Sequence, residues 1–119
     1  MAQPHDRIAR VNEILKREIA DIIEKHGVGG GDTLVSVTKV HASESLRNAA
    51  VYVSVFGAGK ERTAEIFRAL NKLRTEIQHN VSRRVILKYT PVLHFIHDTN
   101  LEEGDKVLSL IRELEENEQ

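Results

Sequence analysis

Two short runs of β-forming residues lie close together in this 119-residue chain, and a third lies far downstream. The first two cover residues 35–40 and 49–57, and the third covers residues 90–98. Valine, isoleucine, tyrosine and phenylalanine are frequent in them, which favours strands over helices. Because one long helical segment separates the second run from the third, the chain is expected to fold as an α+β domain with a three-stranded sheet.

Apolar residues at spacings of three and four predict two amphipathic helices. The first is expected from about residue 4 to 26 and carries Ile8, Val11, Leu15, Ile19 and Ile22. The second is expected over residues 61–85 and carries Ile66, Leu70, Leu73, Ile77 and Val81. The glycines at 27, 29, 30 and 31 end the first helix. We interpret them as a connector and not as a phosphate-binding loop, since no strand precedes them.

The strand runs also predict which side chains face the helices. Alternation places Ala49, Val51, Val53 and Val55 toward the helices. It leaves Ala50, Tyr52, Ser54 and Phe56 on a mixed face that is expected to be largely open. In the first run the apolar phase changes at Val40, which predicts a β-bulge near residues 38–40. Residues 43–48 are expected to form the hairpin loop.

Length and composition limit the class of protein. A chain of 119 residues fits one domain, and 4% aromatic residues without tryptophan predict an aliphatic core. The absence of cysteine excludes disulfides and thiolate metal sites. No run of about 18 apolar residues spans a membrane, and the charged first 20 residues do not resemble a signal peptide. A cytoplasmic protein without membrane contact is therefore expected.

Charge is segregated along the chain, although the formal net charge is only −1. Residues 60–91 hold three anions against these cations: Lys60, Arg62, Arg68, Lys72, Arg74, Arg83, Arg84 and Lys88. Residues 99–119 hold two cations against these anions: Glu102, Glu103, Asp105, Glu113, Glu115, Glu116 and Glu118. The acidic end therefore hides a basic segment in the total, and that segment is typical of proteins that contact nucleic acid.

No pattern in the sequence supports catalysis or a metal site. Gly57-Ala58-Gly59-Lys60 lacks the spacing of a phosphate-binding loop and is interpreted as a strand-to-helix turn. His94 and His97 should point to opposite faces of one strand, so they cannot hold one metal ion together. The other histidines have no nucleophile at a recognisable spacing. We expect neither an enzyme nor a cofactor.

The order helix, strand, strand, helix, strand is typical of small KH-type RNA-binding modules. Four stretches add a family likeness: residues 7–11, 35–43, 49–54 with Gly57, and 87–95 with Asp98. On these stretches the chain resembles ribosome-binding factor A, a bacterial factor in small-subunit maturation, over residues 7–114. The resemblance implies a KH type II fold and binding to the 30S subunit through 16S rRNA. It also implies non-catalytic roles in late maturation, rRNA processing and cold adaptation.

The chain departs from the family pattern at two places. The family usually interrupts the long helix with Ala-x-Gly, where this chain has Leu73-Arg74-Thr75. The sequence therefore leaves open whether the helix is kinked near Thr75. The family's hairpin aspartate is replaced by Ser45, which can still close a turn.

Two functional hypotheses follow from these patterns. The first is an RNA-binding assembly factor, expected to be a monomer, that contacts rRNA phosphates with Lys72, Arg74, Arg83, Arg84 and Lys88. The second is a protein-interaction module that uses the open sheet face, with Tyr52 and Phe56, or the acidic C-terminal segment. Strong salt dependence of binding is expected only for the first.

The charge boundary also predicts how the chain is divided. Residues 1–98 are expected to form the KH-like RNA-binding domain, and residues 99–119 a separable acidic helix. Asn100 and Glu103 can form a capping box at its start. Because this segment is acidic, we expect it to tune RNA binding and not to provide the site.

Overall fold

The computed structural model describes residues 4–99 of the chain. Its elements are α1 (Pro4–His26), β1 (Leu34–Ala42), β2 (Asn48–Phe56), α2 (Lys60–Arg84) and β3 (Val92–His97). The predicted order of helices and strands is confirmed. The acidic helix expected over residues 99–119, with its capping box, lies outside the described residues except for Thr99.

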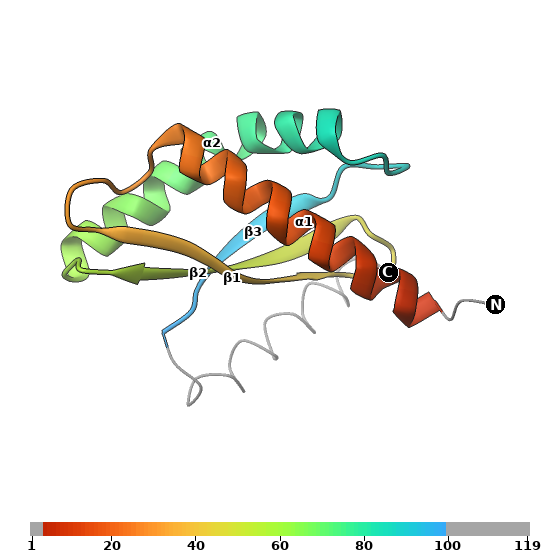
Figure 1. The fold of residues 1–119 in the computed structure, drawn as a ribbon, viewed down its shortest axis with the longest axis horizontal. Helices are drawn as coiled ribbons and strands as arrows, with labels where there is room; N and C mark the ends of the chain where they lie inside the picture. Colours follow the sequence, from red (N-terminus) through yellow and green to blue (C-terminus); the bar gives the residue numbers. More distant parts are fainter. Residues whose placement is uncertain (1–3, 100–119) are drawn as a thin grey trace.

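The three strands form one mixed sheet in the order β1-β2-β3. β2 pairs antiparallel with β1 and parallel with β3. A parallel pair needs a crossover connection, and α2 provides it. Both helices lie on the same face of the sheet, so the fold has two layers (Figure 1).

The predicted bulge in β1 is present at Thr38. Val37 pairs with Val53, whereas the next paired residue, Lys39, faces Tyr52. Thr38 is therefore the extra residue of the bulge. The shift lets Val35 before the bulge and Val40 after it pack against the same core, which explains the change of apolar phase seen in the sequence.

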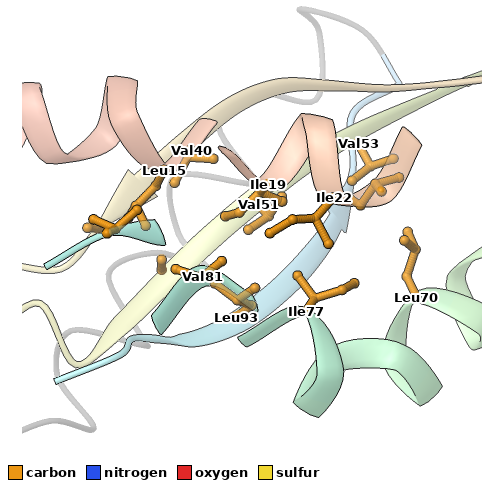
Figure 2. Close-up of a cluster of buried hydrophobic side chains, with 14 of the residues drawn as sticks. Leu15, Ile19, Ile22, Val40, Val51, Val53, Leu70, Ile77, Val81 and Leu93 are labelled. Carbon is orange, nitrogen blue, oxygen red and sulfur yellow. The ribbon is translucent and has the colours of Figure 1, made fainter. Parts of the chain in front are cut away.

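The core lies between the sheet and the two helices, and its buried side chains are aliphatic (Figure 2). α1 contributes Leu15, Ile19 and Ile22; β2 contributes Val51 and Val53; α2 contributes Leu70, Ile77 and Val81; β3 contributes Leu93. The predicted inward faces are confirmed. Burying each such side chain contributes about 1.5–3 kcal/mol to folding.

The mixed face of β2 differs from the prediction at its centre. Ala50 is buried and Tyr52 is only 6% exposed, whereas Phe56 is 74% exposed. Ile96 of β3 packs against Ala50 and Tyr52 and forms a second, small apolar cluster with them. Alternation along β2 shows that these residues share a face, but it cannot show which side chains of a neighbouring strand cover that face.

α2 is one continuous helix through Leu73-Arg74-Thr75. In Figure 1 its teal second half runs in a different direction from its green first half. α2 contains neither glycine nor proline. The helix therefore changes direction without either of the residues that commonly break a helix. The missing family glycine therefore does not change the element itself.

The two predicted turns are confirmed. The hydroxyl of Ser45 accepts a hydrogen bond from the backbone N–H of Arg47 at 3.3 Å, which closes the hairpin loop. Gly57 has a φ of 82° between β2 and α2. A side chain at Gly57 would collide with the carbonyl oxygen of Asp32, so both the conformation and the close approach require glycine.

Candidate nucleic-acid interface

One row of basic side chains follows the solvent side of α2. It consists of Arg68, Lys72 and Arg83, with the imidazole of His79 in line with them, and all four side chains are exposed. At about 100° per residue, their spacings place them within about 60° of one another around the helix axis. This α2 cationic row lies opposite the buried stripe of Ile66, Leu70, Ile77 and Val81. Cations there can meet phosphates without being desolvated.

Arg74 does not belong to this row. It is exposed, but it lies about 160° around the helix axis from Lys72, beside the buried stripe. The two side chains therefore cannot contact one flat surface together. The RNA-binding residues predicted from the sequence therefore do not all lie on one side of α2.

Arg84 is directed toward α1. Its guanidinium donates hydrogen bonds to carboxylate oxygens of Asp21 at 2.7 Å and Glu18 at 3.3 Å. The bond to Asp21, followed by that to Glu18, raises the pKa of Arg84. In turn, the bond from Arg84 and a second from Lys25 lower the pKa of Asp21. Arg84 therefore joins α2 to α1.

The sequence contains a partial signal for this contact. Arg84 follows Val81 by three residues and Ile77 by seven, so it falls on the apolar side of α2. The acidic partners on α1 could not be paired with it from one sequence, because their approach depends on how the helices pack. Arg83, one residue earlier, is turned by about 100° and belongs to the α2 cationic row.

Lys88 lies in the connection between α2 and β3, beside the aromatic ring of Tyr89. Its ammonium nitrogen is 5.5 Å from the ring centroid of Tyr89. The guanidinium carbon of Arg47, from the hairpin loop, is also 5.5 Å from that centroid. The interleaved Lys88 and Tyr89 were visible in the sequence, but Arg47 reaches them only through the fold.

Residues 4–99 contain neither a candidate metal site nor a membrane-spanning helix. Among them there is no group of three or more histidine or acidic side chains that could hold a metal ion. No helix in this part of the chain is long and apolar enough to cross a bilayer. His94 and His97 lie in β3, where His94 contacts Asn48 and the ring of His97 lies 5.2 Å from that of Phe67.

Of the two aromatic residues expected on an open sheet face for protein interaction, only Phe56 is exposed. Tyr52 is buried, and burial followed by the charge of Asp98 raises its pKa to about 12. Phe56 remains exposed and pairs in register with Leu34, which is exposed as well. Exposed apolar side chains on this face therefore lie at both ends of the sheet, with Val92 of β3, which is 41% exposed, at the end opposite Phe56 and Leu34.

Comparison with known proteins identifies a family likeness over most of the chain. The family model for ribosome-binding factor A matches residues 7–111. Ribosome-binding factor A of Acetivibrio thermocellus is 39% identical over 109 residues, which cover 91% of this chain and 88% of that protein.

A crystal structure and a fitted homology model share the fold. The crystal structure of ribosome-binding factor A from Thermus thermophilus is 26% identical and has a TM-score of 0.65. The match covers 76% of this chain and 94% of that one. A homology model of the Thermus thermophilus factor, fitted into a cryo-EM map of a 30S–RbfA complex, has a TM-score of 0.58 at 26% identity. That match covers 70% of this chain and 86% of the other.

Proposed function

This chain belongs to the ribosome-binding factor A family, and from that premise we propose that it binds the small (30S) ribosomal subunit through its 16S rRNA. The family match over residues 7–111 carries the proposal. Its support includes a fold shared with a relative whose coordinates were fitted into a 30S complex. The proposed role is that of a binding factor without catalysis.

The finer parts of the proposal come from the family likeness of the sequence. They are a role in late maturation and rRNA processing, and in cold adaptation. The protein would act in the cytoplasm as a monomer. Residues 1–98 would form the RNA-binding domain, and residues 99–119 an acidic segment that modulates it.

The α2 cationic row and Lys88 are the proposed phosphate contacts. Lys72 and Arg83 are exposed and lie about three helical turns apart on one side of α2. The row crosses the bend of α2, and its exposed cations suit the backbone of an A-form helix, which proteins recognise by shape and phosphate contacts more than by sequence. Arg74 would contact RNA from the side of α2 next to the buried stripe. Arg84 would support the site by its hydrogen bond to Asp21 of α1.

A single charge reversal tests this surface. Arg83→Glu should weaken binding to 30S subunits and reduce the salt slope of the affinity, because one phosphate contact is lost. Each lost contact is worth roughly 0.7 to 0.9 in that slope. Binding should be measured over a salt series, with melting curves as a check on folding.

Lys60→Glu is the matched control. It changes the same charge on the same helix, at the opposite end of α2, about 34 Å away along the axis. Arg83→Glu alone should lose affinity and salt dependence. Equal effects of the two variants would mean that only net charge matters. Wild-type protein with no salt-dependent binding to 30S subunits or 16S rRNA would contradict the RNA-binding proposal and favour the protein-interaction hypothesis.

A further inference from the structure

We propose that Tyr89, Arg47 and Lys88 form a binding site for an unpaired RNA nucleotide, with the ring of Tyr89 stacking on its base. We call these three residues the Tyr89 platform. The inference rests on the RNA-binding function proposed above and adds a second kind of contact to it. The α2 cationic row binds backbone charge, whereas the platform binds a base.

The ring of Tyr89 is available to a ligand. Tyr89 is 51% exposed, in contrast to the buried Tyr52. The cationic groups of Arg47 and Lys88 each lie 5.5 Å from its centroid, near the outer limit of about 6 Å for a cation–π contact. Both side chains are exposed. Both cationic groups are therefore accessible to the phosphate of a nucleotide whose base stacks on the ring.

The backbone beneath the platform is held in place by hydrogen bonds. The N–H of Val92, at the start of β3, donates to the carbonyl of Arg47 at 2.9 Å. The N–H of Arg47 donates to the hydroxyl of Ser45. Pro91 next to Val92 is fully buried. These contacts tie the hairpin loop to the α2–β3 connection, so the ring and both cations are brought together before any ligand binds.

The combination of groups favours a nucleotide over an acidic peptide. An acidic peptide would satisfy the two cations and leave the exposed ring without a partner. A nucleotide supplies a flat base for the ring and a phosphate for Arg47 or Lys88. The base must be unpaired, since the faces of paired bases are stacked within a duplex. Lys88 follows the end of α2 by four residues, so the platform is close in sequence to the end of the helix that carries Arg83.

Tyrosine fluorescence can report on this site directly. The chain has two tyrosines and no tryptophan, so Tyr52→Phe leaves Tyr89 as the only tyrosine emitter. The full chain carrying Tyr52→Phe is titrated with single-stranded oligouridine and with an abasic oligomer of the same length. Stacking predicts that oligouridine quenches the emission and binds more tightly, by roughly fivefold or more for one stacked base. The abasic oligomer keeps the phosphates and should do neither.

Variants separate stacking from charge. In an otherwise wild-type chain, Tyr89→Leu should lose the preference for oligouridine at an unchanged salt slope, because the ring carries no charge. Tyr89→Phe should retain that preference, because it keeps the ring. Arg47→Gln should retain some preference and reduce the salt slope by about 0.7, the value for one phosphate of a single strand.

The outcomes distinguish this site from the proposed function. Equal affinity for oligouridine and the abasic oligomer, in a folded protein that still binds 30S subunits, would overturn the platform and leave the proposed function intact. A protein that binds neither oligomer nor the subunit would overturn both. Retention of the base preference by folded Tyr89→Leu would place the stacking elsewhere and contradict the site.

Discussion

Arg83 and Arg84 are adjacent in the sequence but face different surroundings. Arg83 is exposed on the α2 cationic row, whereas Arg84 donates to Asp21 and Glu18 of α1. Replacing Arg84 by glutamate would place a third carboxylate beside two others, so loss of binding in that variant would partly report on folding. Arg83 is therefore the residue at which charge can be changed without disturbing the contact between the helices.

The Asp21–Arg84 contact predicts a pH-dependent contribution to stability. Because the folded-state pKa of Asp21 is lowered below 3.8, the stabilisation is present above that pH and is lost as pH falls through the lower folded-state value. Asp21→Asn should therefore lower the melting temperature at neutral pH, and the difference from wild type should shrink in acid. Thermal melts across a pH series measure this.

Glu24→Gln is the control for that experiment. It removes a carboxylate at an exposed position of the same helix, three residues beyond Asp21. A deficit of Asp21→Asn that persisted unchanged below the folded-state pKa would show that the contact with Arg84 is not electrostatic.

Single core residues should also have measurable effects. Leu70 and Val53 are fully buried, so Leu70→Ala or Val53→Ala should cost about 1–5 kcal/mol of unfolding free energy through lost burial and a residual cavity. Denaturant unfolding measures the cost. Leu73→Ala, on the half-buried edge of the same helix, should cost less than Leu70→Ala. Wild-type stability of Leu70→Ala would contradict the packing in Figure 2.

At the scale of elements, the regular spacing of apolar residues predicted the helices, the strands and their buried faces. Period-3.6 and period-2 patterns specified both helices, the inward faces of β2 and the bulge at Thr38, because burial on one face imposes those periods. They could not show that Ile96 covers Tyr52, because that contact joins two strands far apart in the chain. The charge count likewise selected Lys72, Arg83 and Lys88, but not the distances that bring Arg47 to Tyr89.

The α2 helix illustrates the same division. Its charge excess predicted a basic surface, and helical geometry then divides that surface into the α2 cationic row, the flank with Arg74 and the inward Arg84. A list of cations without their angles around the axis would treat all of them alike. The direction of each side chain decides whether its charge meets solvent or another helix.

At the scale of the whole molecule, the acidic segment can be removed to test its role. A chain ending at Asp98 keeps the bonds that close the sheet at this point: the hydroxyl of Thr38 donates to the Asp98 carboxylate at 2.6 Å, and the Asp98 N–H donates to the carbonyl of Val53. We expect it to fold and to bind RNA at least as tightly as the full chain at low salt, where repulsion by the seven anions of residues 99–119 is screened least.

The matched control for truncation is the full-length chain with those seven anions neutralised to glutamine or asparagine. If repulsion is the cause, both proteins should gain affinity at low salt and converge with wild type at high salt. A folded truncation that has lost RNA affinity would show that residues 99–119 provide contacts of their own.

The parallel pairing of β2 with β3 also constrains the order in which the chain can fold. β1 and β2 are joined by a short loop and can pair through contacts that are local in sequence. The pairing of Asn48 with Val92 joins distant residues and can form only after α2 has crossed the sheet. During synthesis the edge of β2 that pairs with β3 therefore has unpaired backbone groups until that six-residue strand emerges. Pairing with β3 thus covers an edge of β2 that could otherwise pair with another chain and aggregate.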